Sequence, residues 1–156
     1  MKKRVDLPEK KYEGYIFDLD GTLVDSMPLH YRAWREALAR AGAPDHVFRA
    51  DEFYSCGGKS ANDVVRFLNE RYGMHMDAAS TAADKRRIYL EMLEKEGMQP
   101  IREVVEFVHS LGDAPKAIAT GSAMPGASRT LAAAGLSGLF DVILTPDEVE
   151  LSLIHI

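Results

Sequence analysis

The sequence predicts an α/β protein in which a small parallel sheet is interrupted by a helical insertion. Three short apolar runs, at residues 15–17, 117–120 and 141–145, are each followed by polar or turn-forming residues, as is typical of buried parallel strands. Between the first two runs, apolar residues recur at helical spacing instead. The resulting order is strand, helix, helical insertion, helix, strand, helix, strand, which favours a layered α/β core.

The first predicted strand, Tyr-Ile-Phe at residues 15–17, ends in an Asp-Leu-Asp-Gly turn. We expect a helix next, because Pro28 suits a first helical turn and Gly42 suits a stop. Either Asp25 or Ser26 can cap this helix. Four apolar residues share one of its faces: Trp34, Ala37, Leu38 and Ala41.

The insertion has a mostly helical pattern up to Gly97. One helix is expected to begin at a capping-box sequence, residues 60–63, and to end at Gly73. A longer, highly charged helix is predicted over residues 77–96. Within it, the Asp-Lys-Arg-Arg run at 84–87 is expected to be a solvated face.

Beyond Pro100, helices and strands alternate again. A helical stripe closes at Gly112, the strand at 117–120 follows, and a helix over 125–135 leads into the strand at 141–145. The stripe consists of Val104, Val105, Val108 and Leu111.

Composition excludes several classes of protein. The 156 residues carry 19 Lys and Arg against 24 Asp and Glu, a net charge of -5, which disfavours a broad basic surface for nucleic acid. No apolar run approaches the roughly 18 residues of a membrane span. The single cysteine, Cys56, cannot form an internal disulfide and favours a reducing compartment. We therefore expect a cytoplasmic protein that binds neither nucleic acid nor membranes. We also expect the full-length parent to be a monomer.

Three polar residues follow predicted parallel strands: Asp18, Asp20 and Thr120. The carboxyl ends of strands carry the chemistry of open α/β sheets, so these residues are expected to converge. In an extended chain the two carboxylates leave on the same side, and their like charges need a cation or a shared proton. Such a pair suits phosphoryl transfer with Mg²⁺, one carboxylate attacking phosphorus and the other moving a proton. The plainer alternative is a tight turn with two solvated acids.

Two other motifs are excluded by spacing. A calcium-binding loop that opened at Asp18 would need glycine and glutamate where the sequence has Leu23 and Leu29. A phosphate-binding loop that ended in the Gly-Gly-Lys-Ser run at 57–60 would need its first glycine at Phe53.

Ten contiguous residues, 17–26, carry a resemblance to a known family. They read Phe-Asp-Leu-Asp-Gly-Thr-Leu-Val-Asp-Ser, which resembles the first signature of the haloacid dehalogenase (HAD) superfamily. The resemblance implies a Rossmann-like HAD core with a cap domain, in which Asp18 is the nucleophile and Asp20 is the general acid/base. It also implies that Mg²⁺ is bound by the Asp18 carboxylate and the main-chain carbonyl of Asp20.

A second stretch, Ala-Ile-Ala-Thr-Gly-Ser at residues 117–122, resembles the second motif of the same superfamily. The resemblance implies that Thr120, with Gly121 and Ser122, binds the transferring phosphoryl group. The alternative is a strand end followed by a Ser122 cap on the next helix, and the two interpretations can hold together.

The resemblance also implies a division into domains: a core over residues 1–26 and 98–150, and a helical cap over 27–97. This cap is similar to that of the branch with β-phosphoglucomutase and sugar-phosphate phosphatases, which often has His and Trp at the positions of His30 and Trp34. We interpret the tryptophan as a core anchor. For the histidine two interpretations stay open: a hinge residue, or a residue that positions the acid/base or senses cap closure.

In the cap, Gly57 and Gly58 precede Lys59 and Ser60 at a predicted helix start. There, backbone N–H groups and a cation can meet an anionic or hydroxyl-rich part of a substrate, and the glycines allow a close approach. A solvated lysine beside an ordinary helix cap is the alternative, and it stays open.

Two departures from the mutase pattern favour hydrolysis. The mutase branch usually has a lysine at the position of Ala123 and an arginine near Ser60, cations that hold a second phosphate. The resemblance therefore implies a Mg²⁺-dependent phosphatase that acts on a small phosphorylated metabolite through an aspartyl-phosphate. Two alternatives stay open: a β-phosphoglucomutase-like phosphomutase, and a non-catalytic binding or interaction protein.

The last six residues, 151–156, read Leu-Ser-Leu-Ile-His-Ile, a translation of CTG TCT CTT ATA CAC ATC. That string resembles a transposase adapter from sequencing libraries, so we expect a non-native tail on a shortened chain; the alternative is a natural C-terminal strand. The family's downstream lysine and acidic metal ligands do not follow Glu150. We accordingly expect an inactive N-terminal fragment with an incomplete core and an exposed sheet edge.

Overall fold

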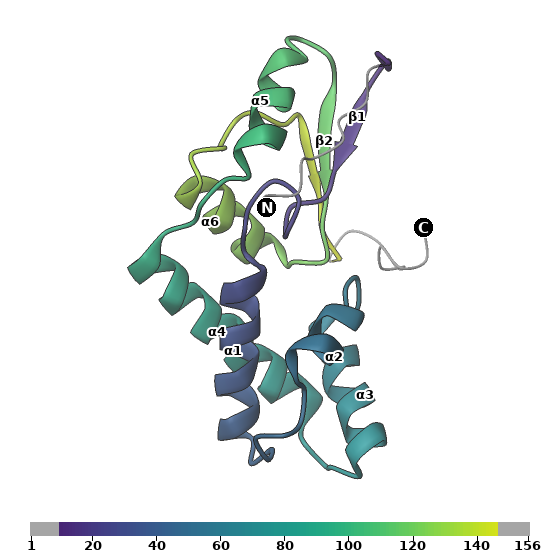
Figure 1. Cartoon of the computed structure of the whole chain (residues 1–156), viewed down its shortest axis with the longest axis vertical. Helices are drawn as coiled ribbons and strands as arrows, with labels where there is room; N and C mark the ends of the chain where they lie inside the picture. The colour runs from purple at the N-terminus through teal and green to yellow at the C-terminus, as the bar shows by residue number, and fades with distance from the viewer. Residues whose placement is uncertain (1–9, 147–156) are drawn as a thin grey trace.

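The computed structural model describes residues 10–146, whose helices and strands form two packed groups (Figure 1). The predicted tail at 151–156 lies outside the described residues. The first group holds three strands, α5 (Arg102–Ser110) and α6 (Met124–Ala133). The second group holds α1 (Met27–Arg40), α2 (Ala50–Ser55), α3 (Ala61–Tyr72) and α4 (Ala78–Glu96). The α/β class and the inserted run of helices are therefore confirmed.

The described sheet has three parallel strands in the order β1-β2-β3. The strands are β1 (Tyr15–Phe17), β2 (Lys116–Ala119) and β3 (Val142–Leu144). All three predicted strands are confirmed, with ends that differ by about one residue. Because the strands are parallel, their carboxyl ends meet at one edge of the sheet.

Both helices predicted between residues 60 and 96 form, and each has a side-chain cap at its start, of which only the Ser60 cap was expected; the short helix α2 was not predicted. Ser60 caps α3 by accepting a hydrogen bond from the Asp63 N–H (3.2 Å). Asp77 caps α4 by accepting from the Ser80 N–H (2.7 Å). Within residues 10–146, no helix is both long and apolar enough to cross a membrane.

The two segments that connect the groups run side by side. The Asp25 N–H donates to the Gln99 carbonyl (3.0 Å), and the Ile101 N–H donates to the Leu23 carbonyl (2.8 Å). The chain therefore leaves the sheet region and returns to it at one place, as an inserted domain requires. The assignment of residues 27–97 to a separate cap stays a prediction.

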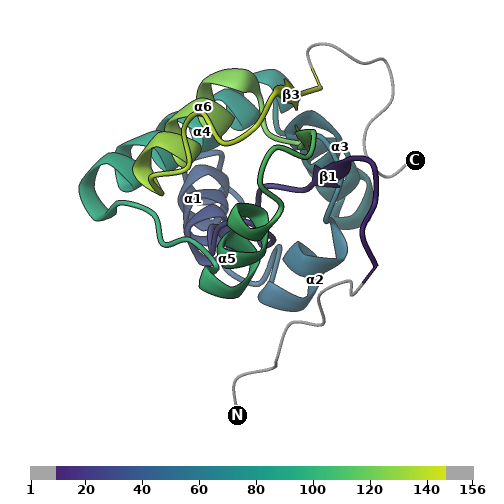
Figure 2. The same cartoon turned by 90° about the horizontal axis from the view of Figure 1, so that it is seen from above.

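Two apolar clusters form the interior. The larger one fills the space between the sheet, α5 and α6, and it takes in one face of α1 and α4. The second lies between α1, α2 and α3. Trp34 belongs to the second cluster and is only 4% exposed, which confirms its interpretation as a core anchor. Seen from above, α4 lies along α6, so the insertion is packed directly on the sheet group (Figure 2).

One face of the described sheet is covered, and the other is bare. The register partners Phe17, Ile118 and Ile143 belong to the larger cluster beneath α5 and α6. On the opposite face, Ile16 is 74% exposed and Val142 is 50% exposed. Parallel sheets are usually covered on both faces, so this apolar surface is unusual for a sheet of this kind.

Alanine substitutions at two neighbouring residues of β1 are expected to have very different effects on the free energy of unfolding. Phe17→Ala should lower the free energy of unfolding by about 3–5 kcal/mol, because it removes a ring packed against Phe107 and Phe140 and leaves a cavity. Ile16→Ala should change it by less than about 0.5 kcal/mol, because the side chain is exposed. Urea denaturation measures both, and a larger loss for Ile16→Ala would contradict the orientation of β1.

Candidate active site

A cavity of about 490 Å³ lies at the carboxyl ends of the strands, between the sheet and the inserted helices. Asp18 and Asp20 line it from the end of β1, and Gly121 and Ser122 line it from the end of β2. Most of the remaining wall comes from α1, α4 and the segment that runs from α2 into α3, and the first turn of α6 adds to it. The two strand-end motifs therefore meet in one cavity, as the topology of a parallel sheet requires.

Asp18 is the exposed carboxylate of this cavity. Its Oδ1 accepts from the Leu19 N–H (2.7 Å), and its Oδ2 has no partner within residues 10–146. Partial loss of hydration at the cavity wall raises the pKa of Asp18, although its side chain still contacts solvent. The hydrogen bond from the Leu19 N–H opposes this rise, and the negative charge of Asp20 adds to it. The open oxygen can bind a cation or attack an electrophile.

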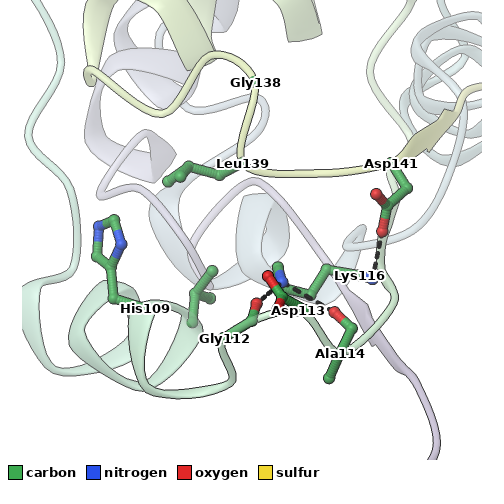
Figure 3. Close-up of a pocket in the computed structure, with 9 residues that line it drawn as sticks. His109, Gly112, Asp113, Ala114, Lys116, Gly138, Leu139 and Asp141 are labelled. Carbon is green, nitrogen blue, oxygen red and sulfur yellow. Dashed lines mark hydrogen bonds between the residues drawn. The ribbon is translucent and has the colours of Figure 1, made fainter.

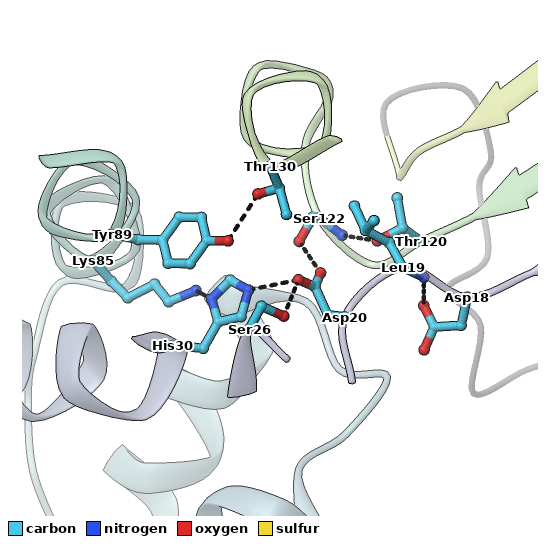
Figure 4. A network of polar contacts seen from close by, with 10 residues as sticks. All are labelled: Asp18, Leu19, Asp20, Ser26, His30, Lys85, Tyr89, Thr120, Ser122 and Thr130. Carbon is cyan, nitrogen blue, oxygen red and sulfur yellow. Dashed lines mark hydrogen bonds and ion pairs between the residues drawn. The ribbon is translucent and has the colours of Figure 1, made fainter. Parts of the chain in front are cut away.

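Asp20 is held by three donors, two from the start of α1 and one from the segment after β2 (Figure 4). Its Oδ1 accepts from Ser26 Oγ (2.6 Å) and His30 Nε2 (3.0 Å), and its Oδ2 accepts from Ser122 Oγ (2.7 Å). Burial alone would raise the pKa of Asp20, but the hydrogen bonds from His30, Ser26 and Ser122 hold it well below its usual range. In this geometry Asp20 is a carboxylate.

The two carboxylates do not leave the chain on the same side, contrary to the expectation for an extended segment. The chain bends at Leu19, whose carbonyl accepts the N–H groups of Leu23 and Val24. The Leu19 side chain is fully buried and anchors this bend in the core. As a result, Asp18 and Asp20 point in different directions and have separate partners (Figure 4).

His30, on α1, joins Asp20 to a buried lysine. Its Nδ1 lies 2.7 Å from Lys85 Nζ. A charged lysine amine can only donate, so Nδ1 accepts, and the ring proton is on Nε2, which donates to Asp20. Burial first, and then the Lys85 charge, lower the pKa of His30, while Asp20 opposes them. The contact between His30 and Asp20 is therefore a hydrogen bond from a neutral imidazole.

Lys85 is a residue of the candidate site that the sequence analysis missed. The run at 84–87 was expected to be solvated, but Lys85 is only 9% exposed, and this expectation is wrong for it. Its amine lies 5.6 Å from the ring centroid of Trp34 and 5.4 Å from that of Tyr89. A signal was present, because Lys85 precedes Ile88 and Tyr89 by three and four residues and so shares their apolar face.

The burial of Lys85 predicts a pH-dependent stability. Burial lowers the pKa of Lys85 from 10.5 to about 8; the Asp20 charge opposes this shift and Arg86 adds to it. Between these values the unfolded chain binds more protons than the folded chain, so the contribution of Lys85 to the free energy of unfolding rises with pH. We expect the stability of the wild type relative to Lys85→Met to increase from pH of about 8 to about 10.5.

Urea denaturation at several pH values across this window measures the difference between the wild type and Lys85→Met. Lys95→Met is the matched control, because it removes an exposed lysine from the same helix. A difference that stays constant or falls as the pH rises would contradict the burial of the Lys85 amine.

The second motif contributes cavity residues and one buried threonine. Thr120 is 4% exposed and does not line the cavity; its Oγ1 accepts from the Ser122 N–H (3.1 Å). The Ser122 hydroxyl does not cap α6, whose N-cap residue is Ala123. Ser26 does occupy the N-cap position of α1, but its side chain makes no capping hydrogen bond. Both serine hydroxyls donate to Asp20 instead.

The predicted cap residues line the facing wall of the cavity. Gly58 has a φ of 81°, a left-handed conformation that favours glycine. The Ser60 hydroxyl is engaged by Asp63, since it donates to Oδ2 (2.6 Å) and accepts from the N–H. The Lys59 amine lies 6.0 Å from the ring centroid of Phe67 and has no carboxylate partner within residues 10–146. The Lys59 side chain therefore has donors available to a ligand.

The carboxylate of Asp18 fits a magnesium ion. Mg²⁺ usually keeps several waters and is bound through one or two carboxylates together with phosphate oxygens of a substrate. Asp18 offers an open carboxylate oxygen at the cavity. No group of three or more His, Cys, Asp or Glu side chains in the described range could hold a metal. The described residues therefore suit a sparsely bound ion that shares its ligands with solvent and substrate.

A second hollow, of about 310 Å³, lies at the amino ends of β2 and β3 (Figure 3). The Lys116 amine donates there to the carbonyls of Gly112 (2.5 Å) and Ala114 (2.8 Å), and Asp141 accepts from the Lys116 N–H (2.8 Å). These charged groups hold the loops around β2 together. Because α/β sheets bind ligands at the opposite, carboxyl edge, we assign no function to this hollow.

Comparison with known proteins identifies the family. The sequence matches the haloacid dehalogenase-like hydrolases over residues 15–152, a range that contains both strand-end motifs. The chain therefore belongs to the haloacid dehalogenase-like hydrolases.

The chain is similar to sugar-phosphate phosphatases within this family. It is 30% identical over 142 residues to the fructose-1-phosphate phosphatase YqaB of Escherichia coli, a match that covers 90% of this chain and 73% of that protein. Hexitol phosphatase A of the same organism is 32% identical over 142 residues, with 88% of this chain and 61% of that protein covered. A solved hydrolase structure from Pseudomonas syringae is 28% identical with a TM-score of 0.75, and the match covers 87% and 62%. The chain thus spans between 61% and 73% of the length of these relatives.

Proposed function

We propose that this protein is a cytoplasmic, Mg²⁺-dependent phosphatase that hydrolyses a small phosphate monoester, a sugar phosphate, through an aspartyl-phosphate. The observation that carries the proposal is the pair of acids in the cavity: Asp18 has an open carboxylate oxygen, and Asp20 is a carboxylate bound by three donors. Relatives named as a fructose-1-phosphate phosphatase and a hexitol phosphatase support the choice of substrate class.

In the first half of the proposed reaction, an Asp18 oxygen attacks phosphorus, and the bond from phosphorus to the sugar oxygen breaks. Asp20 supplies the proton that the departing oxygen takes up. In the second half, a water molecule attacks the phosphorus of the aspartyl-phosphate and gives its proton to Asp20. Phosphate leaves, Asp18 is restored as a carboxylate, and Asp20 is protonated for the next cycle.

The contacts of Asp20 determine which half of the reaction this conformation suits. With three donors on its carboxylate, Asp20 is ready to accept a proton from water. To donate a proton to the leaving group, it has to turn from Ser26, His30 and Ser122 toward the cavity. We propose His30 as a positioning residue for Asp20, because its other ring nitrogen is fixed by Lys85.

The proposed magnesium ion would be held by the Asp18 carboxylate and the main-chain carbonyl of Asp20. When bound, it supplies positive charge that offsets the charge of the phosphoryl oxygens. We also propose that the Lys59 amine, on the facing wall, binds the leaving-group part of the substrate.

We further propose that the 156-residue chain has little or no phosphatase activity by itself. Lys116 is the last lysine of the sequence, and its amine is engaged by two carbonyls at the far end of the sheet. The downstream lysine that the resemblance implies beside the phosphoryl group is therefore not among these 156 residues. Activity should accordingly be measured on the complete gene product, whatever its length, as well as on the 156-residue chain.

A panel of small phosphate esters tests the proposal, with free phosphate and the organic product both measured. We expect the complete gene product to release phosphate and sugar in equal amounts, and a chelator to abolish the release. Isomerisation of a sugar phosphate without phosphate release would indicate the phosphomutase alternative. Binding without any turnover would indicate the non-catalytic alternative.

A further inference from the structure

Tyr89 connects the inserted helices to the sheet group beside the Asp20 network (Figure 4). Its ring, on α4, stacks on the His30 imidazole with a centroid distance of 4.0 Å and an interplanar angle of 3°. Its hydroxyl lies 2.8 Å from Thr130 Oγ1 on α6. Tyr89 is 4% exposed and Thr130 is 1% exposed, so this hydrogen bond is shielded from water.

The stacked ring restricts rotation of the His30 imidazole. Both hydrogen bonds of His30 lie in the plane of its ring, with Asp20 at Nε2 and Lys85 at Nδ1. A rotation of the imidazole about its bond to Cβ breaks both hydrogen bonds and also drives the ring edge into the phenol face of Tyr89. The stack therefore stabilises the one orientation in which His30 reaches both partners.

The hydroxyl of Tyr89 links the His30 side of the Asp20 network to the Ser122 side. Thr130 lies on α6, and the segment that leads into α6 contains Ser122, which donates to the second oxygen of Asp20. The contacts accordingly form a closed circuit from Asp20 through His30, Tyr89 and Thr130 to α6 and back through Ser122. A phenylalanine would provide the same apolar packing. The Tyr89 hydroxyl therefore adds the hydrogen bond to Thr130, which packing alone does not supply.

We propose that Tyr89 is a positioning residue, which sets the plane of the His30 imidazole and couples the placement of α4 on α6 to the hydrogen bonds of Asp20. The geometric part of this inference stands on the described contacts. Its consequence for catalysis rests on the proposed function, because it takes Asp20 to be the acid/base. When α4 shifts on α6, the Tyr89 stack and the Asp20 hydrogen bonds change together.

Nitrogen-15 NMR of the histidine rings in the 156-residue chain tests the geometry without any need for activity. In the wild type, His30 should show one tautomer, with the proton on Nε2 and slow exchange of that proton with water. Tyr89→Leu removes the stack, so the two ring-nitrogen signals of His30 should move toward each other as the ring samples other orientations. Tyr31→Leu is the matched control, because it removes a different ring contact of α1, the one with Phe53.

Conservative variants distinguish the effect of the Tyr89 hydroxyl from that of its ring. They also test the inference if Tyr89→Leu does not fold. Tyr89→Phe and Thr130→Val each remove one side of the buried hydrogen bond. Both variants should keep the His30 tautomer, but the Nε2 proton should exchange with water severalfold faster. The double variant should exchange this proton little faster than either single variant, because both substitutions remove the same hydrogen bond. Exchange rates equal to that of the wild type in both variants, or wild-type His30 signals in a folded Tyr89→Leu, would overturn the inference.

A kinetic measurement then tests the consequence for catalysis. In the complete gene product, Tyr89→Leu should lower kcat by about tenfold or more with little change in KM, since a small misplacement of a catalytic group has effects of this order. An unchanged kcat, with His30 signals that do move, would overturn the link to Asp20 chemistry. A gene product with no phosphatase activity would contradict the proposed function but leave the NMR result to decide the geometry.

Discussion

Asp18→Asn is expected to lower phosphate release from every substrate by about 10³-fold or more, because an amide oxygen cannot replace a carboxylate as the attacking nucleophile. The side chain is exposed and makes a single hydrogen bond within residues 10–146, so the variant should fold like the wild type. The loss should be of similar size for sugar phosphates and for p-nitrophenyl phosphate, because both need the same attack on phosphorus. It should appear in kcat.

Steady-state phosphate release from the complete gene product measures this effect, and circular dichroism checks the fold. Asp45→Asn is the matched control, because the Asp45 side chain is fully exposed and pairs with Arg35, away from the cavity. Activity of Asp18→Asn within tenfold of the wild type would exclude Asp18 as the nucleophile.

Asp20→Asn is expected to have an effect that depends on the leaving group. For a sugar phosphate the rate should fall by about 10²–10⁴-fold, because the sugar oxygen leaves as an alcohol and needs a proton. For p-nitrophenyl phosphate, whose phenolate leaves without a proton, the first half-reaction should be nearly unaffected. The different response of the two substrates separates the role of Asp20 from that of Asp18.

Burst kinetics with p-nitrophenyl phosphate measure the first half-reaction directly, since the second half also uses Asp20 as a base. Because the introduced amide keeps the shape of the side chain but faces three donors, the stability of the variant should be measured alongside its activity. Equal losses for the two substrates in the burst phase would exclude Asp20 as the general acid.

Much of the fold was predictable because its determinants are local in the chain. The strands follow from short apolar runs that end in turns, and α3 follows from the Ser60 and Asp63 pair at its start. Gly73, with a φ of 64°, ends that helix in a conformation that favours glycine. Each of these signals lies within a few residues of the element that it specifies.

The site was only partly predictable, because its polar groups take partners that are far away in the sequence. Ser26 and Ser122 have the residue type of helix caps, and each occupies or adjoins a helix start. Their hydroxyls donate to Asp20 instead, and Ser122 is 102 residues from it. No local rule separates a capping serine from one that is drawn to a buried carboxylate.

Lys85 is a charged residue whose burial could not be predicted from its immediate neighbours in the sequence. Its neighbours in sequence are charged, which indicates a solvated helix face, and the run at 84–87 is otherwise of that kind. The structure places this amine in the interior, where His30, 55 residues away on α1, lies within 2.7 Å and accepts a hydrogen bond from it. The partner compensates part of the cost of removing the charge from water.

The sequence by itself determined the α/β class, the order of the strands and of every helix except α2, and the two motifs whose acids, glycine and serine meet at the carboxyl edge of the sheet. Apolar periodicity and strand direction are sufficient for those conclusions, since they depend on local patterns and on the parallel topology. Only the tertiary structure decided the orientation of Asp18 and Asp20 and the partners of His30, Lys85 and Tyr89. The physical reason is that hydrogen bonds between buried polar groups depend on where distant segments pack, and that placement is a property of the folded chain as a whole.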